Sequence, residues 1–441
     1  MTDDPRAIPW GGGSLPMDLP PAWPEPMVAW PDLAGAVADY PAALEAALAE
    51  PTGGVPLAEG VGPGSRVAFV VDDPSRWTPV REALPTLIHK FLSAGISPKN
   101  ISVSVAVGRH AAVDADSMRK RVGEAVFSTY RTYSPPVDDG SRYVDLGVTA
   151  EGVPVRVFRP VAEADVRVLV GSVLPHLQAG FGGGHKLVFP GTSHRSTLGA
   201  LHAQGLGGDA ARLLGGDVAT NPMRAAIRHA AALLPGRCVS VSHLLGVPPA
   251  VLRVASGDVD LVQQALADEA RRRFRAPTGA PADVVIAGNA PWPGDPMMSF
   301  KALLNHRAAG RPGGVLVGVF WTDPAEIDRS FPLGALRAIA ASGAVGGFVA
   351  SRGLRLADRA VSALKLPSRF MVRWARELVV DRTVLVYAPA LHDRLGPRLG
   401  PIRIFDDLPP LWRAAEKALG GRVPSSVRVF PRGGLTYCPA G

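Results

Sequence analysis

The sequence has little cysteine and lacks the short motifs that mark several common enzyme classes. Its two cysteines, Cys238 and Cys438, cannot form a zinc cluster and give no disulfide framework, which fits a reducing cytoplasm. No GxxxxGK[ST] phosphate loop, HExxH zinc motif or GxSxG nucleophile elbow is present. No GxGxxG fingerprint follows the first predicted strand, so an ordinary NAD enzyme is disfavoured.

The sequence also lacks the signals of secretion and of membrane insertion. It starts with MTDDPRAIPWGGGS, which has no apolar core, so no signal peptide is visible. No apolar run approaches the roughly 20 residues that span a bilayer. The net charge of +8 is modest for 441 residues, and the basic residues are scattered except for one short cluster. We therefore expect a cytoplasmic protein without a nucleic-acid or membrane partner.

Strand and helix patterns alternate through most of the chain, which predicts an α/β protein of two domains with largely parallel sheets. Buried strands are predicted from continuous apolar runs at 66–71, 101–107, 166–173, 283–287, 314–320 and 383–387. Helices are predicted at 80–92, capped by Thr78 and Pro79, and at 114–126. Residues 1–60 have little periodicity, and their first few tens are expected to form an extended arm.

The predicted domain boundaries follow from a linker-like stretch at 276–281. An N-terminal cofactor-binding and catalytic domain is expected at 1–280, and a smaller C-terminal domain at 282–422. The tail, 423–441, is free to return to the first domain.

One stretch, residues 175–202, holds an unusual concentration of reactive side chains. It contains four of the ten histidines and a glycine run that leads into His185 and Lys186. Glycine allows close approach of the backbone to a bound group, so the run predicts a loop around a ligand. Only 7 of the 47 basic residues are lysines. Unlike the guanidinium of arginine, the amine of Lys186 can become a nucleophile or form a covalent link.

Polar side chains follow three of the predicted strands, where ligands bind in open parallel sheets. Asp73 and Arg76 follow the first, His110 follows the second and His176 follows the third. Two histidines on opposite faces of a substrate are suited to an inversion of configuration, because one removes a proton and the other returns it. Arg76 is suited to hold a carboxylate.

At these residues the sequence resembles the lactate racemase family, whose members use a nickel-pincer nucleotide. The similarity is carried by DPSR at 73–76, GRH at 108–110, PHLQAGFGGGHK at 175–186, LVFPG with His202 sixteen residues after Lys186, NPMRAAI at 221–227 and Lys301. These motifs extend over nearly the whole chain, and the PHxxAGFxGGxK pattern is the most specific of them.

The resemblance implies a role for each matching residue. Lys186 would carry the pyridinium-3,5-bisthiocarboxylic acid mononucleotide covalently, and His202 would be the protein ligand of a square-planar nickel. His110 and His176 would be the acid/base pair. Cofactor contacts are implied for Asp73, Pro74, Ser75 and Arg76, and substrate contacts for Arg76, Met298 and Lys301. The active site would lie in the cleft between the domains.

The implied reaction is the racemisation or epimerisation of a 2-hydroxy acid, through hydride transfer and a 2-keto acid. Proteins that make the cofactor are implied as partners. Lactate racemases have Tyr-Gln where this chain has Met297 and Met298. This more apolar pair predicts a bulkier or more hydrophobic substrate than lactate. Two alternatives stay open: a pincer-dependent oxidoreductase that releases the keto acid, and a non-catalytic cofactor-binding homologue.

Overall fold

The computed structural model describes residues 6–110, 112–206, 213–277, 279–292, 296–330, 353 and 369–439. Side chains at 296–297, 328–330 and 369–371 are outside this description. The described chain divides into two compact units. The first unit discussed below comprises 33–206 and 215–272, and the second comprises 6–32, 213–214 and 273–439.

The first unit is built on a sheet with the strand order β13-β12-β9-β4-β5-β6. Neighbouring strands are parallel except for the antiparallel pair β12 and β13. The strands are β4 (Val67–Asp72), β5 (Ile101–Ala106), β6 (Arg131–Tyr133), β9 (Val166–Val173), β12 (Arg237–Leu245) and β13 (Val251–Gly257). Short antiparallel pairs are β7 (Tyr143–Val148) with β8 (Pro154–Phe158) and β10 (Pro175–His176) with β11 (Gly180–Phe181).

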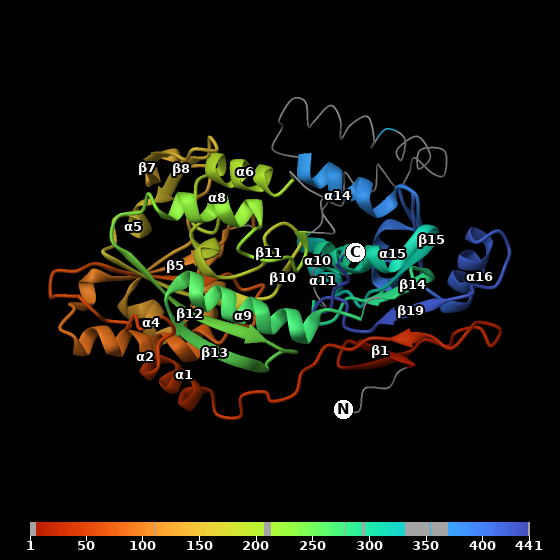
Figure 1. Ribbon diagram of the computed structural model, residues 1–441, viewed down its shortest axis with the longest axis horizontal. Coiled ribbons are helices and arrows are strands. Elements are labelled where there is room, and N and C mark those ends of the chain that lie inside the picture. The colour runs from red at the N-terminus through yellow and green to blue at the C-terminus, as the bar shows by residue number, and fades with distance from the viewer. Residues whose placement is uncertain are drawn as a thin grey trace. The chain divides into compact units, whose positions relative to one another are not determined.

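Helices cover both faces of this sheet, and Figure 1 shows α2 and α8 on opposite sides of it. The helices are α1 (Tyr40–Ala49), α2 (Val80–Ser93), α3 (Ala115–Val122), α4 (Glu124–Thr129), α5 (Arg159–Ala162), α6 (Arg195–Gln204), α8 (Pro222–Ala231) and α9 (Val259–Phe274), with a 3₁₀ turn η3 (Gly184–Leu187).

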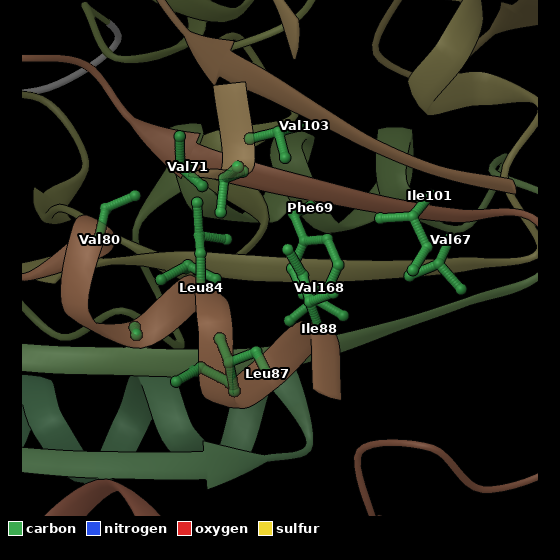
Figure 2. Close-up of a cluster of buried hydrophobic side chains, with 14 of the residues drawn as sticks. Val67, Phe69, Val71, Val80, Leu84, Leu87, Ile88, Ile101, Val103 and Val168 are labelled. Carbon is green, nitrogen blue, oxygen red and sulfur yellow. The ribbon is translucent and has the colours of Figure 1, made fainter. Parts of the chain in front are cut away.

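The alternation of side chains along β4 explains why the sheet is buried on both faces. Val67, Phe69 and Val71 lie in one apolar cluster with α2, as Figure 2 shows. Val70 points to the opposite face and joins a second cluster that includes residues of α5 and α8. Successive side chains of a strand alternate between faces, so a continuous apolar run suits a strand covered on both sides.

The second unit contains another sheet, ordered β17-β18-β16-β15-β14-β19-β3. Its strands are β3 (Met27–Val28), β14 (Ala282–Gly288), β15 (Gly310–Val319), β16 (Thr383–Tyr387), β17 (Arg398–Leu399), β18 (Ile402–Phe405) and β19 (Val427–Phe430). All pairs are parallel except β17 with β18.

Both faces of the second sheet are also covered. Its helices are α10 (Pro296–His306), α11 (Pro324–Ser330), α14 (Arg369–Val379), α15 (Pro389–Leu395) and α16 (Leu408–Ala418). Residues of α10, α14 and α15 pack on one face. The other face is covered by α16 and by residues near the hairpin of β1 (Ala7–Trp10) and β2 (Gly13–Pro16).

The predicted fold class, α/β with largely parallel sheets, is confirmed. Several local predictions need correction. The first few tens of residues are not simply an extended arm, because they form β1, β2 and β3, and β3 pairs with β19. β19 itself pairs with β14, so the tail joins the sheet of the second unit. The change between units falls near residue 273, not at 281, and the segment 6–32 groups with the C-terminal part.

Two helix predictions also differ from the structure. The expected helix at 114–126 is two helices, α3 and α4, because Gly123 separates them with φ of +88°. Thr78 does not cap α2, whose N-cap is Pro79 without a side-chain hydrogen bond. The hydroxyl of Thr78 donates instead to Asp72.

Within the described residues, no helix is long and apolar enough to cross a membrane.

Candidate active site

Four of the predicted site residues follow three adjacent parallel strands of the first unit, in the order β9-β4-β5: Asp73, Arg76, His110 and His176. In this sheet Asp72, the last residue of β4, is in register with Ala106 of β5. Asp73 therefore follows β4 at the same edge where His110 follows β5, and His176 of β10 comes shortly after β9. Parallel strands place their carboxyl ends at one edge, which is where α/β sheets bind ligands.

The segment 73–76 is anchored by its buried neighbour Asp72. Oδ2 of Asp72 accepts hydrogen bonds from the hydroxyls of Thr78, at 2.6 Å, and Ser172, at 2.8 Å. Burial raises the pKa of this carboxyl, against the opposing effects of Arg121 and the two hydroxyls. These contacts tie the end of β4 to β9 and to the start of α2.

Arg121 of α3 fixes the backbone of the same segment. Its guanidinium donates to the carbonyl oxygens of Asp72 at 2.8 Å, Arg76 at 2.9 Å and Thr78 at 3.0 Å. Burial of Arg121 lowers its pKa, and the nearby carboxylate of Asp72 opposes that effect. Arg121 is thus a support of segment 73–76 that the sequence pattern did not reveal.

Asp73 and His110, which follow neighbouring strands, are in contact. Nδ1 of His110 lies 3.2 Å from Oδ2 of Asp73, and the side chains are 46% and 13% exposed. Oδ1 of Asp73 accepts the backbone N–H of Ser75 at 2.8 Å. Burial alone would raise the pKa of Asp73, but the hydrogen bond and charge of His110, the charge of Arg76 and the bond from Ser75 lower it. Asp73 is therefore an ionised acceptor at neutral pH.

His176 is held by backbone amides that follow it. Its Nδ1 accepts the N–H groups of Gln178, at 3.2 Å, and Ala179, at 3.1 Å. A nitrogen that accepts two hydrogen bonds carries no proton, so the neutral ring has its proton on Nε2. The buried side chain of Gln178 also donates to the backbone oxygen of His202 at 3.0 Å, which links the segments of the two histidines.

His202, in α6, has a geometry that suits a metal ligand. Its Nδ1 lies 2.8 Å from the carbonyl oxygen of Leu198, one helical turn earlier. Donation from Nδ1 places the lone pair of the neutral ring on Nε2, as in most metal-binding histidines. Among the described residues, no group of three or more His, Cys, Asp or Glu side chains could hold a metal.

Lys186 lies in η3, at the end of the glycine loop. The buried side chain of Arg224, in α8, donates hydrogen bonds to four carbonyls of this loop: those of Ala179, Phe181, Gly182 and Gly183. Burial lowers the pKa of Arg224 to about 9. Arg224 thus supports the loop that carries Lys186, although NPMRAAI gave no indication of this role.

The glycine run has a structural reason that the sequence did not reveal. A Cβ on Gly183 would lie 2.9 Å from the backbone oxygen of Ser172, and one on Gly184 would lie 2.8 Å from Oε1 of Gln263. Both glycines also have positive φ, +77° and +62°. The loop is therefore fitted closely against β9 and α9. The backbone contact and the positive φ require glycine at Gly183, and at Gly184 the positive φ favours it.

Met298 and Lys301 lie on α10, in the second unit. Nζ of Lys301 is 2.8 Å from Sδ of Met298, whose side chain is 7% exposed. The thioether is a weak acceptor, so Met298 presents the amine with a softer and less polar neighbour than an amide would. The side chain of Met297 lies outside the described part of the chain.

Comparisons with known proteins find lactate racemases among the relatives of this chain. A family model for the lactate racemase N-terminal domain matches residues 11–213. The lactate racemase of Thermoanaerobacterium thermosaccharolyticum is 23% identical over 268 residues, which are 59% of this chain and 60% of that protein. The lactate racemase of Lactiplantibacillus plantarum is 23% identical over 282 residues, or 63% of this chain and 65% of that protein. These matches span somewhat less than two thirds of each relative.

Solved structures extend the similarity of fold to the whole chain. The lactate racemase apoprotein of T. thermosaccharolyticum superimposes with a TM-score of 0.79 at 19% identity, covering 98% of this chain and 99% of that one. A protein from Thermotoga maritima has a TM-score of 0.61 at 14% identity, covering 87% and 96%. The molecule is thus an α/β protein with the fold of a lactate racemase apoprotein. Over residues 11–213 it matches the family of the lactate racemase N-terminal domain.

Proposed function

We propose that this protein is an isomerase that racemises or epimerises a 2-hydroxy acid, either lactate-like or bulkier, with a nickel-pincer nucleotide as cofactor. The observation that carries the proposal is the match to the lactate racemase N-terminal domain over the segment that contains Asp73, His110, His176, Lys186 and His202. All five residues lie in the first unit. Asp73, His110 and His176 follow the neighbouring strands β4, β5 and β9, Lys186 lies in η3, and His202 lies in α6.

The residues present fit the cofactor that the family implies. Lys186 would provide the amine for a covalent link, from a loop that Arg224 and the close contacts of its glycines hold in shape. His202 would provide Nε2 as the nickel ligand, since its Nδ1 is engaged by a backbone carbonyl. When bound, the pincer nucleotide would supply the group that takes the hydride from C2 of the substrate and returns it to either face of the 2-keto acid.

The chain itself would supply binding and proton transfer. Arg76 would bind the substrate carboxylate by charge-assisted hydrogen bonds, and Met298 and Lys301 are the other proposed substrate contacts. His110 and His176 would exchange the hydroxyl proton, which must leave before the carbonyl forms and return when the hydride does. Proteins that build and load the cofactor are the expected partners.

The first experiment compares wild type with Lys186→Ala after coexpression with cofactor-making enzymes. Intact mass and nickel content should show an adduct and stoichiometric metal in the wild type, and neither in Lys186→Ala. Lys99→Ala, at an exposed lysine, is the matched control and should load normally. An unmodified, nickel-free wild type, beside a lactate racemase that loads in the same cells, would contradict the proposed cofactor.

The loaded protein then allows the reaction to be tested. A chiral screen of 2-hydroxy acids should show interconversion of enantiomers or epimers, with a bulkier acid preferred to lactate because of Met298. His110→Gln and His176→Gln should each abolish turnover and leave nickel bound, whereas His89→Gln, on the exposed surface of α2, should change neither. Accumulation of free keto acid would instead indicate an oxidoreductase, and a loaded but inert protein would indicate a non-catalytic homologue.

A further inference from the structure

The two histidines of the proposed acid/base pair are held in opposite ways. Nδ1 of His110 faces a carboxylate oxygen of Asp73, at 3.2 Å, whereas Nδ1 of His176 faces two backbone N–H groups. A carboxylate can only accept a hydrogen bond, and an amide N–H can only donate one. Neutral His110 therefore carries its proton on Nδ1 and its lone pair on Nε2, and neutral His176 has the reverse arrangement.

We infer that Asp73 is a positioning residue, which fixes the Nδ1–H tautomer of His110 and reserves Nε2 of His110 as the proton acceptor of the pair. This assignment differs from the cofactor contact that the resemblance implies for Asp73. The inference adds to the proposed function and rests on it, because the proposed substrate supplies the hydroxyl proton that Nε2 accepts. The hydrogen bond and the tautomer depend only on the contacts of this chain.

The surroundings of the pair support this arrangement. Asp73 is 13% exposed and His110 is 46% exposed, so the carboxylate lies beneath an imidazole that solutes can reach. Arg76 keeps its Nη1 on the hydroxyl of Ser75, at 3.1 Å, and the charge of Arg76 favours the ionised form of Asp73. Oδ1 of Asp73 is occupied by the N–H of Ser75, so Oδ2 is the oxygen that serves His110.

In the proton transfer, the O–H bond of the substrate breaks as an N–H bond forms at Nε2 of His110, and the ring becomes an imidazolium. The electron pair of the O–H bond stays on the substrate oxygen and forms the carbonyl when hydride leaves C2. The carboxylate of Asp73, already bonded to Nδ1–H, balances that positive charge. His176 begins as a hydrogen-bond donor at Nε2, so it is suited to bind the oxygen of the hydroxy or keto acid while His110 accepts the proton.

The contacts of Asp73 make the substitution Asp73→Asn diagnostic. The Ser75 N–H requires an acceptor, so the amide oxygen of the new asparagine should take the position of Oδ1 and its NH₂ group the position of Oδ2. That NH₂ group would face Nδ1 of His110 as a donor, and His110 should shift its proton to Nε2. A nearly isosteric change would thus convert the proton acceptor into a donor.

Long-range ¹H–¹⁵N correlation spectra of the histidine rings, recorded on the full chain at about pH 8, report which nitrogen is protonated. His110→Gln assigns the His110 signals by their disappearance. We expect Nδ1–H in the wild type and Nε2–H in Asp73→Asn, with His176 unchanged. Asp116→Asn, an exposed carboxylate paired with Arg119, is the matched control and should leave the His110 signals as in wild type.

Cofactor loading and turnover give the second readout. Asp73→Asn should keep the adduct and the nickel but lose about 10²–10⁴-fold in turnover, the usual contribution of a general base. Loss of loading would show that Asp73 contacts the cofactor, and an Nε2–H tautomer in the wild type would show that Asp73 does not set the ring; either result overturns the inference. If the wild type racemises no 2-hydroxy acid but the tautomer of His110 still changes in Asp73→Asn, the proposed function is refuted and Asp73 keeps its role in fixing the tautomer.

Discussion

Removal of the Arg224 guanidinium should strongly destabilise the loop that carries Lys186. This side chain is 3% exposed and donates to four carbonyl oxygens between Ala179 and Gly183. Each hydrogen bond contributes about 1 kcal/mol net, and a buried carbonyl left without a donor costs at least as much. Arg224→Ala should therefore lower the free energy of unfolding by about 4 kcal/mol, a large part of the 5–15 kcal/mol typical of a domain.

The substitution Arg224→Lys tests whether geometry or charge matters more. An ammonium group concentrates its donors at one point and cannot reach four carbonyls as the planar guanidinium fork does. We expect it to restore only part of the lost stability. Urea unfolding followed by circular dichroism measures the change, and amide hydrogen exchange over 179–186 shows whether the loss is local to the loop.

Arg228, on the same helix, provides the matched control. It donates to the carbonyls of Val218 and Ala219 from a half-buried position, so Arg228→Ala should cost under about 1 kcal/mol. Equal effects of Arg224→Ala and Arg228→Ala, or no faster exchange in the loop of the former, would refute the assignment of Arg224 as its main support.

Three further predictions concern stability. Arg422 holds the pKa of the buried Asp283 below its usual value, so the stability that Asp283 contributes is present above about pH 4 and is lost on further acidification. Asp283→Asn should cost about 3 kcal/mol at pH 7 and should make the midpoint of urea unfolding depend less on pH between pH 5 and 3. Burial lowers the pKa of His243 to about 4, so melting temperature should fall as pH drops from 6.5 to 4, and less steeply in His243→Gln; identical slopes would contradict this. A Cβ on Gly191 would lie 2.1 Å from a backbone oxygen, whereas one on Gly108 meets nothing within 4 Å, so Gly191→Ala should prevent folding and Gly108→Ala should cost about 1 kcal/mol through its φ of +54°; similar yields of folded protein would refute the contrast.

Apolar runs were sufficient to predict the longer parallel strands. The run at 166–173 coincides with β9 and that at 383–387 with β16, because strands covered on both faces favour apolar side chains at most positions. Placement of Asp73 and His110 after neighbouring strands followed from the same pattern. Their direct hydrogen bond did not, because it depends on the rotamers of both side chains.

Residues that act through the backbone carried no recognisable pattern. Arg121 and Arg224 resemble ordinary helix arginines in the sequence, yet both are buried and bind carbonyls of segments far away in the chain. The split of the helix predicted at 114–126 depends on a positive φ at Gly123. The pairing of the segment near Met27 with β19 joins the two ends of the chain, which no local window of sequence can detect.

The sequence by itself determined the α/β class and the positions of the longest parallel strands, because these follow from local periodicity. Residue chemistry predicted which side chains react. Only the tertiary structure decided which proton each histidine carries, since a tautomer is set by the partner of the opposite ring nitrogen. For His110 that partner is a carboxylate, for His176 a pair of amides, and for His202 a carbonyl. These partners come from folding, and they leave a lone pair on Nε2 of His110 and His202 but a proton on Nε2 of His176.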